Sequence, residues 1–574
     1  MSHKQELWDA AREWLEQDDD EETRAELRDI LKRADVEALN ERFGGRLQFG
    51  TAGLRGILGA GPNRMNRVMV RRVTAGLAEY LKSALPNARE RGVVLGHDAR
   101  RKADVFVADA ASVLLGAGFK VHLLPALVPT PLTSFATTRL GAAAGVMVTA
   151  SHNPPEYNGY KVFWETGGQI IPPHDAGISA AIDLVGRTDL LPMVTLEEAR
   201  AQDRLLDVGS DLFEAYLKGI SKLGAHPSAL PALKLAYTPL HGVGLDLTRR
   251  ALAKAGLEHF RVVPDQAEPD GSFPTVRFPN PEEKGAMDAV IELARDSGSD
   301  LAIATDPDAD RLAVAAPEVA DGDFEILGGD EVGALLAHYL LTEGHGGPER
   351  LVATTIVSSR MLAAIAEYHG ISYLDTLTGL KWIADAALRH KQEHGSRLVL
   401  GYENALGYTI GELVRDKDGV SATLVFAEMA AWLKTQGRTV LDYLEEANRL
   451  YGLYLTRTTS LVFDAGEAGK IASIMDRVRK EPPAHLGDME VTESIDMSRG
   501  DRGLPPENLF VHHLEGGTRV LIRPSGTEPK LKSYYEVKEV VQKGEPVSTA
   551  RARARAALDS LEKTHQAWLR AAAF

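Results

Sequence analysis

One order of sequence elements recurs three times in this chain and limits the folds available to it more than any other feature. Residues 92–126, 233–265 and 351–376 each contain an apolar run, a small polar turn, a helical pattern, a glycine and a second apolar run. This order is typical of a strand–helix–strand unit and favours a parallel or mixed sheet. The similarity is one of order rather than identity. Two explanations therefore stay open: an internal triplication, or the ordinary recurrence of such units in α/β proteins.

A further apolar run follows each unit and ends in an unusual loop. The three runs are GVMVTASHNP (145–154), SDLAIATDPDADR (299–311) and RLVLGYENALGY (397–408). Open α/β sheets bind ligands beyond the carboxyl ends of their parallel strands, because helix N-termini and free backbone amides converge there. We therefore expect the three loops to contribute to one composite site.

The chain of 574 residues is too long for a single hydrophobic core. After Tyr451 its texture changes to short strands, charged turns and a terminal helix rich in alanine and arginine. The predicted fold class is α/β, with three related mixed-sheet domains and a C-terminal α+β domain. The expected domains are 1–205, which includes an exposed N-terminal helical extension, 206–322, 323–448 and 449–574.

Charge and composition exclude several partners. The net charge of -16 argues against nucleic acid and against an anionic membrane surface, since both are bound through an excess of Lys and Arg. The absence of cysteine excludes disulfides, thiolate zinc sites and a cysteine nucleophile. The acidic N-terminus lacks the apolar core of a signal peptide, and no stretch approaches the roughly 20 apolar residues of a membrane span. We expect a cytoplasmic protein, either a monomer or a homodimer.

The loop DPDADR places Asp306, Asp308 and Asp310 at alternate positions, so in an extended backbone their carboxylates project to the same side. Three hard oxygen ligands suit Mg²⁺. A calcium-binding EF-hand is excluded, because its loop needs glycine and glutamate where this chain has Arg311 and Pro317. The other interpretation is a solvated acidic turn, but the loop directly follows a strand that looks buried. The sequence therefore favours metal binding.

Ser151 has three interpretations. A hydrolase serine normally lies in a G-x-S-x-G elbow with a histidine distant in sequence, whereas His152 is adjacent and points the other way in an extended chain. Alternatively, Ser151 caps a turn, since Ser-His-Asn-Pro-Pro is rich in turn-forming residues. The third interpretation is that its hydroxyl carries a phosphoryl group, with the Asp triad's Mg²⁺ neutralising charge and Lys161 handling a proton.

Three basic loops offer anion contacts. RPSGTEPK (523–530) combines an arginine, two hydroxyls and a lysine around a glycine, which suits a phosphate, although an ordinary polar turn has the same composition. The loops containing Arg55 and Arg100 give weaker signals, and Arg55 serves a surface ion pair equally well. From the residues alone, the sequence supports magnesium-dependent phosphoryl chemistry.

Taken together, these loops resemble those of the α-D-phosphohexomutase family, which comprises phosphoglucomutases and phosphomannomutases. The resemblance runs in order through FGTAGLRG, TASHNPPEYNGYKV, DPDADRLAV, GYENALGY and RPSGTEPK. The details TPLHGVG, LTGLKWI and VRDKDG look most like the branch of phosphoglucomutases and phosphopentomutases. The resemblance implies four domains around a central cleft, the fourth closing over a phosphosugar substrate.

The resemblance also implies roles for individual residues. Ser151 is the expected phosphoserine and, with Asp306, Asp308 and Asp310, a ligand of Mg²⁺. A sugar bisphosphate such as glucose 1,6-bisphosphate is the expected intermediate and activator. The expected catalytic residues besides Ser151 are Lys161, Lys417, Arg55 and His152, and the expected substrate-binding residues are Arg311, Thr378, Gly379, Glu403, Asn404, Arg523, Ser525, Gly526 and Thr527.

The sequence departs from the family in the loop that is expected to bind the sugar, Glu403–Ala405. Many members have a serine in a glutamate-rich stretch here, whereas this chain has Glu403-Asn404-Ala405, and alanine donates no side-chain hydrogen bond. We expect a mutase interconverting glucose 1-phosphate and glucose 6-phosphate. The alternatives are a phosphopentomutase, a phosphomannomutase, a glucose 1,6-bisphosphate synthase and a catalytically silent sugar-phosphate binding protein.

Overall fold

The computed structural model describes residues 3–51, 53–318, 322–463, 468–501, 503–525 and 530–572. The chain forms two compact units. The first contains Met1–Ile326 together with Gly407–Thr435, and the second contains Leu327–Leu406 together with Gln436–Phe574. The first unit is therefore discontinuous in sequence, because a later segment returns to complete it.

Three helices begin the first unit: α1 (His3–Gln17), α2 (Glu21–Arg33) and α3 (Val36–Phe43). Asp20 and Asp35 cap α2 and α3 by accepting backbone N–H groups of their first turns. Leu7, Trp14 and Leu27 are buried in the same core as the first sheet. The extension is thus only partly exposed, because its apolar positions form a stripe that packs on the neighbouring domain.

The first sheet has six strands in the order β1–β5–β4–β2–β3–β6. β2, β3, β4 and β6 are parallel, whereas β5 is antiparallel to both of its neighbours. Both β2 and β4 are buried along their full length, as expected for central strands covered by helices on both faces. The elements are β1 (Leu54–Ile57), α4 (Arg67–Ala84), α5 (Ala88–Arg91), β2 (Val93–His97), α6 (Ala103–Gly116), β3 (Val121–Leu123), α7 (Thr130–Arg139), β4 (Ala144–Val148), β5 (Tyr157–Trp164), α8 (His174–Asp183), α9 (Leu196–Ala201) and β6 (Leu205–Asp207).

The second sheet also belongs to the first unit and has the order β11–β10–β9–β7–β8. Helix α16, in the returning segment, packs on β9 and β10. It is apolar and buried almost all round, which is the pattern of a helix enclosed in a core. The elements are α10 (Ser210–Ile220), β7 (Lys234–Thr238), α11 (Leu245–Lys254), β8 (His259–Val262), α12 (Asp288–Ser297), β9 (Leu301–Thr305), β10 (Leu312–Pro317), β11 (Phe324–Ile326) and α16 (Gly419–Thr435). The returning segment also contains β15 (Gly407–Ile410), which is not a strand of this sheet.

The second unit begins with a third α/β sheet, in which β12 lies between β13 and β14 and is parallel to both. Helices α13 and α15 pack against its strands, and Leu351, Ile383 and Leu398 contribute to a small core there. The elements are α13 (Gly329–Thr342), β12 (Arg350–Thr355), α14 (Met361–His369), β13 (Ser372–Thr376), α15 (Leu380–His394) and β14 (Arg397–Glu403).

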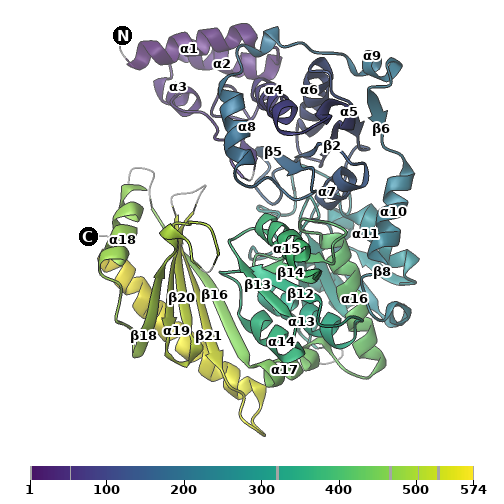
Figure 1. The fold of residues 1–574 in the computed structure, drawn as a ribbon, viewed down its shortest axis with the longest axis vertical. Coiled ribbons are helices and arrows are strands. Elements are labelled where there is room, and N and C mark those ends of the chain that lie inside the picture. The colour runs from purple at the N-terminus through teal and green to yellow at the C-terminus, as the bar shows by residue number, and fades with distance from the viewer. Residues whose placement is uncertain are drawn as a thin grey trace. The chain divides into compact units, whose positions relative to one another are not determined.

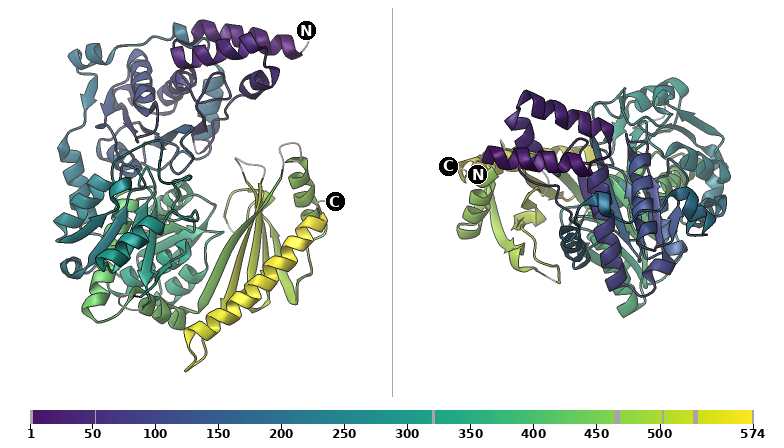
Figure 2. Two further views of the ribbon diagram at one scale, coloured as in Figure 1. Left: turned by 180° about the vertical axis from the view of Figure 1, so that it is seen from behind. Right: turned by 90° about the horizontal axis from the view of Figure 1, so that it is seen from above.

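The C-terminal sheet has six antiparallel strands in the order β16–β21–β20–β19–β18–β17. The long helix α19 lies along this sheet and packs on β16 and β21 (Figures 1 and 2). The elements are α17 (Val440–Tyr451), β16 (Leu453–Val462), α18 (Ala468–Lys480), β17 (His485–Leu486), β18 (Met489–Asp496), β19 (Phe510–Leu514), β20 (Arg519–Pro524), β21 (Lys530–Glu539) and α19 (Val547–Ala572).

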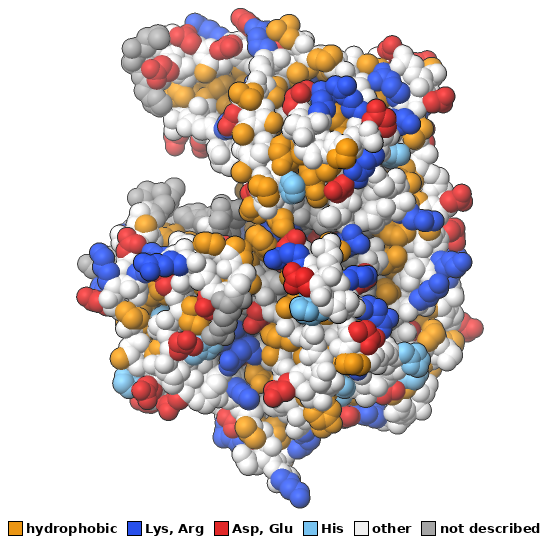
Figure 3. All heavy atoms as spheres, in the orientation of Figure 1, with side chains coloured by type: hydrophobic (Ala, Val, Ile, Leu, Met, Phe, Trp, Pro, Cys, Tyr) orange, Lys and Arg blue, Asp and Glu red, His pale blue; other side chains and the backbone are white. Residues whose placement is uncertain are grey.

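The predicted fold class is confirmed: three helix-covered α/β sheets precede an antiparallel C-terminal sheet. The domain boundaries expected from the sequence stay predictions. Among the described helices, none combines the length and the apolar character that crossing a membrane requires. Basic and acidic side chains are interspersed on the face shown in Figure 3, so on this face the acidic excess does not gather into one block.

Candidate active site

Ser151 lies in the loop after β4, in the left-handed region of the backbone, with a φ of 51°. The hydroxyl of Thr149 accepts the N–H of Ser151 at 2.8 Å and donates to the buried carboxylate of Asp98. Asp98 in turn accepts the N–H of Arg100. The hydroxyl of Ser151 is therefore presented by a turn whose backbone is fixed by buried polar partners.

Arg100 stabilises this loop through its backbone. Its guanidinium is buried and donates to the backbone carbonyl oxygens of Ser151, Asn153, Pro154 and Tyr157, at distances from 2.5 to 3.0 Å. The sequence suggested an anion contact for the loop containing Arg100, but its N–H groups are directed at the backbone. Because a planar fork of donors matches several carbonyls at once, Arg100 holds the loop in shape.

The loop between β9 and β10 brings Asp306, Asp308 and Asp310 together, with one oxygen of each carboxylate lying within 4.8 Å of the others. The reason differs from the predicted extended backbone. The loop turns at Ala309, which has a positive φ, and the carboxylate of Asp306 accepts the N–H groups of Asp310 and Arg311. All three carboxylates are fully buried, so this is not a solvated acidic turn.

Two contacts join the triad to the rest of the first unit. Ser151 donates its hydroxyl hydrogen to Oδ2 of Asp306 at 2.8 Å, and Thr130 donates to Oδ2 of Asp308 at 2.6 Å. Thr130 begins α7, and its N–H also donates to the carbonyl of Asp308 at 2.9 Å. The predicted phosphoserine and the predicted metal ligands therefore adjoin each other directly.

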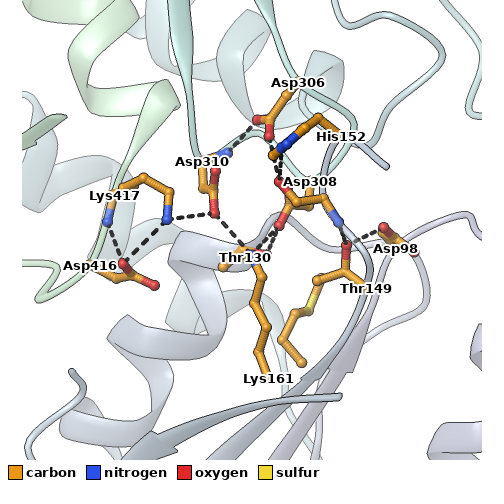
Figure 4. A network of polar contacts seen from close by, with 12 residues as sticks. Asp98, Thr130, Thr149, His152, Lys161, Asp306, Asp308, Asp310, Asp416 and Lys417 are labelled. Atoms are coloured by element: carbon orange, nitrogen blue, oxygen red, sulfur yellow. Dashed lines mark hydrogen bonds and ion pairs between the residues drawn. The ribbon is translucent and has the colours of Figure 1, made fainter. Parts of the chain in front are cut away.

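Lys161 on β5 and Lys417 before α16 face the same carboxylates (Figure 4). The ammonium of Lys161 is 2.7 Å from Asp308 and 2.9 Å from Asp310, and that of Lys417 is 3.2 Å from Asp310. Burial alone would lower the pKa of Lys161, but the two carboxylates raise it above its ordinary value. Both lysines are thus brought to the site, and Lys161 is held in its protonated form there.

The pKa values of the three carboxylates are shifted in different directions. Burial raises the pKa of Asp306 well above the usual carboxyl value, and the charges of Asp310 and Asp308 add to the rise. Burial acts in the same direction on Asp308, but Lys161 beside it lowers the pKa below the ordinary value. The pKa of Asp310 is also lowered, because Lys161 and Lys417 outweigh its burial and the charge of Asp308.

The triad fits a divalent cation. Oδ1 of Asp308 and Oδ1 of Asp310 are buried and accept no hydrogen bond from any residue that the structure describes. An unpaired buried carboxylate oxygen is costly, and a cation bound between the three side chains would remove that cost. Hard oxygen donors of this kind are the ligands that Mg²⁺ prefers.

The ring of His152 lies close to Ser151, with Nδ1 3.2 Å from the serine hydroxyl. The sequence placed the two side chains on opposite sides of an extended chain, but the left-handed turn at Ser151 brings them together. Burial, together with the positive charges of Arg311 and Arg55, holds the pKa of His152 well below its ordinary value. The imidazole is therefore neutral near pH 7 and can share a hydrogen bond with Ser151.

Arg55 and Arg311 provide the remaining positive charge of the first unit's site. Arg55 donates to the side chain of Asn153 at 2.7 Å, in the serine loop. Arg311 is largely buried and is 3.4 Å from Glu282 and 3.8 Å from Asp306. Both predicted arginines thus lie beside the acidic cluster or the serine loop.

Two supporting residues of the Lys417 loop were not found from the sequence. Asp416 accepts the N–H of Lys417 and the side-chain N–H of Gln169, and Asp418 accepts the hydroxyl of Tyr216 at 2.8 and 2.9 Å. Gln169 and Tyr216 are each separated from these partners by more than 200 residues. No local pattern reveals such pairings, which depend on the returning segment.

The other predicted residues belong to the second unit. Glu403 ends β14, Asn404 follows it, and Thr378 and Gly379 precede α15. Arg523 lies on β20, and the N–H of Ser525 donates to the carbonyl of Lys530 at 2.8 Å. Gly526 and Thr527 lie outside the described residues.

Models of the phosphoglucomutase/phosphomannomutase family match the chain in four consecutive parts. The α/β/α domains I, II and III match residues 46–186, 214–319 and 328–451, and the C-terminal domain matches 475–545. The chain belongs to the phosphoglucomutase/phosphomannomutase family. It is accordingly an enzyme of the phosphosugar mutase class, an isomerase that acts by phosphoryl transfer.

Relatives of the chain carry different substrate names. A probable phosphomannomutase of Haemophilus influenzae is 41% identical over 83% of this chain and 93% of its own. A probable phosphoribomutase of Schizosaccharomyces pombe is 39% identical over 91% and 92%. A phosphoglucomutase of Staphylococcus epidermidis is 35% identical over 89% and 94%. The crystal structure of a putative phosphomannomutase from Thermus thermophilus is 25% identical, with a TM-score of 0.68 over 92% of this chain and 99% of its own.

Proposed function

We propose that this enzyme interconverts glucose 1-phosphate and glucose 6-phosphate, with Ser151 as the residue that carries the phosphoryl group. The observation that carries this proposal is the direct contact between the hydroxyl of Ser151 and the carboxylate of Asp306, inside a buried acidic triad. A serine in an ordinary turn does not require three buried carboxylates beside it. A serine that carries a phosphoryl dianion requires a cation next to it, and the three carboxylates would bind that cation.

The proposed transfer consists of two exchanges. The bond between phosphorus and the side-chain oxygen of phosphorylated Ser151 breaks and a bond forms to the free hydroxyl of the sugar monophosphate. That hydroxyl loses its proton to a base, and the oxygen of Ser151 takes up a proton. The resulting glucose 1,6-bisphosphate reorients and its other phosphoryl group is transferred to the oxygen of Ser151, whose hydroxyl proton is lost to a base. The released sugar oxygen takes up a proton. Protons and phosphoryl groups balance over the cycle, and the enzyme ends phosphorylated as it began.

Asp306, Asp308 and Asp310, together with an oxygen of the phosphoryl group on Ser151, would hold Mg²⁺. When bound, this ion neutralises charge on the phosphoryl group. Asp308 and Asp310 also pair with Lys161, so sharing them with a cation would weaken the interaction that keeps Lys161 protonated. Lys161 is therefore placed to exchange a proton with the sugar oxygen, with Lys417 as the second candidate.

The remaining residues would bind and orient the substrate. Arg55 and Arg311 offer guanidinium groups next to Ser151, and neutral His152 positions the serine oxygen. In the second unit, Glu403 and Asn404 would contact sugar hydroxyls, with Thr378 and Gly379 beside the sugar. Arg523, Ser525, Gly526 and Thr527 would hold the phosphate that does not react, because an arginine and hydroxyls match its oxygens.

A second candidate activity is the interconversion of ribose 1-phosphate and ribose 5-phosphate. Two observations favour it: the similarity to a probable phosphoribomutase, and Ala405, which withdraws one hydrogen-bond donor from the sugar loop. Mannose 1-phosphate is a third candidate on the same grounds of similarity. All three use the same Ser151 chemistry and differ in the hydroxyls that the sugar loop must recognise.

A turnover panel separates these activities. Purified enzyme is assayed with Mg²⁺ and a trace of glucose 1,6-bisphosphate on the 1-phosphates of glucose, mannose, N-acetylglucosamine and ribose. We expect the highest kcat/KM for glucose 1-phosphate. The control variant Asp308→Asn should lose nearly all activity on every substrate. A higher kcat/KM for ribose 1-phosphate would replace the glucose assignment with the second candidate.

Two further outcomes test the reaction class. Net formation of bisphosphate from a separate phosphoryl donor, without a bisphosphate primer, would identify a glucose 1,6-bisphosphate synthase. Binding of glucose 6-phosphate without isomerisation of any sugar in the panel would identify a silent binding protein.

A further inference from the structure

Within the second unit, a buried ion-pair cluster joins the C-terminal sheet to the turn after β12. Arg519 at the start of β20 and Glu536 on β21 are cross-strand partners, only 3% and 2% exposed, and their side chains pair at 2.9 Å. Arg360 donates its N–H to the other oxygen of Glu536 at 2.8 Å. One carboxylate of β21 is thus shared between the neighbouring strand β20 and the residue that precedes α14.

Besides its bond to Glu536, the guanidinium of Arg519 donates to the backbone of the turn after β12. It donates to the carbonyl of Ile356 at 2.9 Å and to the carbonyl of Ser358. Arg360 donates in the opposite direction, to the carbonyl of Gly517 just before β20. A planar fork of donors that grips two carbonyls fixes the backbone of the turn 356–360 in orientation as well as position.

This turn holds the sugar loop, which we define as Glu403–Ala405. The hydroxyl of Ser358 accepts the N–H of Asn404 at 3.0 Å, and Ser358 is only 1% exposed. A continuous path of contacts therefore runs from Glu536 through Arg519 and Ser358 to the backbone of Asn404. The same strand β20 that begins with Arg519 ends at Arg523 and Pro524, where the predicted phosphate loop starts.

We propose that Arg519, Glu536 and Arg360 form a positioning cluster through which the C-terminal sheet sets the placement of the sugar loop. The inference rests on the proposed function, in which the sugar loop contacts hydroxyls and the Arg523 loop contacts the distal phosphate. One rigid strand then determines the distance between the two loops. By setting this distance, the cluster favours phosphosugars whose hydroxyls lie at the matching distance from their phosphate.

Two variants test this cluster. Arg519→Lys keeps the positive charge beside Glu536 but cannot reach two carbonyls with a planar fork. Ser358→Ala removes the acceptor for the N–H of Asn404, together with the contact of the same hydroxyl to Thr355 at 2.8 Å. The control is Arg457→Lys, which alters an arginine of the same sheet whose ion pairs, within the described part of the chain, are with Asp559 and Glu562 on α19 rather than with the turn.

We expect Arg519→Lys and Ser358→Ala each to raise the KM for glucose 1-phosphate by about fivefold, the effect of one lost hydrogen bond. The ratio of kcat/KM between glucose and mannose 1-phosphates should fall by a similar factor, and the double variant should show no further loss. A purely structural role would lower the active fraction without changing this ratio. Arg457→Lys should match the wild type in both measures.

Hydrogen exchange provides a readout that does not depend on turnover. Peptides covering 399–406 should exchange faster in both variants and at the wild-type rate in the control. Unchanged KM, substrate ratio and exchange in Ser358→Ala would overturn the proposal, even where Arg519→Lys failed to fold. A wild-type enzyme that isomerises no phosphosugar would instead overturn the proposed function and the role of the cluster in substrate selection. The exchange data would still show whether the cluster holds the sugar loop in place.

Discussion

Ser151 has a backbone conformation that non-glycine residues rarely adopt. Its φ of 51° costs about 1 kcal/mol relative to an ordinary turn residue. Thr149 and Arg100 offset this cost with hydrogen bonds to the backbone on either side of the hydroxyl. The residue that bears this strain is the one whose hydroxyl must project toward the acidic triad.

The first prediction concerns this hydroxyl. Ser151→Ala should lower turnover by more than ~10³-fold, because among the described residues Ser151 supplies the hydroxyl that donates to Asp306. The loop should survive, since its contacts use backbone atoms and Thr149. Steady-state kinetics and intact mass after incubation with glucose 1,6-bisphosphate provide the measurement.

The matched control is Ser299→Ala, a buried serine whose hydroxyl bonds only Ser297 among the described residues. It should keep wild-type activity and the mass increase of one phosphoryl group. A phosphorylated and active Ser151→Ala enzyme would remove Ser151 from the mechanism.

The second prediction concerns Thr130, which orients Asp308. Thr130→Val keeps the β-branched shape but removes the hydroxyl that donates at 2.6 Å. Affinity for Mg²⁺ should fall by about 10–100-fold, the usual effect of removing a partner that orients a metal ligand. Isothermal titration with MgCl₂ measures this change directly.

Thr137→Val is the control for Thr130→Val. It lies on the same helix, and its hydroxyl bonds the carbonyl of Thr133 rather than a carboxylate. Equal Mg²⁺ affinity in Thr130→Val and the wild type would show that the contact to Asp308 has no effect on the metal site.

The sequence singled out side chains that the structure brings together, but not the backbone geometry that brings them together. Asp306, Asp308 and Asp310 are recognisable in DPDADR, but the turn at Ala309 that makes them converge is not. Arg100 carried only a weak signal, because its acceptors are backbone carbonyls, which every residue possesses. Local composition thus identifies side chains with a distinctive chemistry and misses those whose partners have no sequence signature.

At the scale of elements, the recurrent strand–helix–strand order predicted the three α/β sheets. β2, β4 and β9 are fully buried runs ending at polar loops, as expected from their sequences. The interpretation of the N-terminus as exposed was incomplete, because Leu7 and Trp14 find a core that lies elsewhere in the chain. Patterns within an element predict its type, whereas its partners depend on tertiary packing.

The third prediction concerns α19 and the C-terminal sheet. His565 is fully buried beside Tyr535, and burial lowers its pKa to about 3. The folded state therefore keeps the ring neutral while the unfolded chain takes up a proton below pH 6.5. Stability is full above pH 6.5 and is lost as the pH falls toward 3, by about 2 kcal/mol at pH 5.

The variant His565→Gln should remove this contribution, so that its loss of stability between pH 7 and pH 5 is about 2 kcal/mol smaller than that of the wild type. Urea unfolding at the two pH values, followed by tryptophan fluorescence, measures the difference. Exposed His485→Gln is the control and should leave the pH dependence of the wild type intact. An identical pH dependence in His565→Gln would contradict the assignment.

At the scale of the whole molecule, the first unit depends on a segment that lies far along the chain. The segment Gly407–Thr435 supplies Lys417 to the triad and α16 to the second sheet. Because α16 is buried almost all round, the sheet that it covers has no substitute for it within residues 1–326.

The fourth prediction follows from this dependence. A fragment of residues 1–326 should aggregate or unfold, because it exposes the apolar face that α16 covers. Joining residues 407–435 to the fragment through a flexible glycine–serine linker should restore a soluble, cooperatively unfolding protein. Circular dichroism and size-exclusion chromatography distinguish the two fragments, and a stable, monomeric 1–326 fragment would refute the dependence.

The order of the segments also has a consequence during protein synthesis. At about 5–20 residues per second, a ribosome needs on the order of ten seconds to translate Leu327–Leu406 after the strands of the second sheet have emerged. Throughout that interval the nascent chain lacks both the helix that covers β9 and β10 and the ammonium group of Lys417. Codon choice within Leu327–Leu406 therefore sets how long an incomplete sheet is open to chaperones and to premature cation binding.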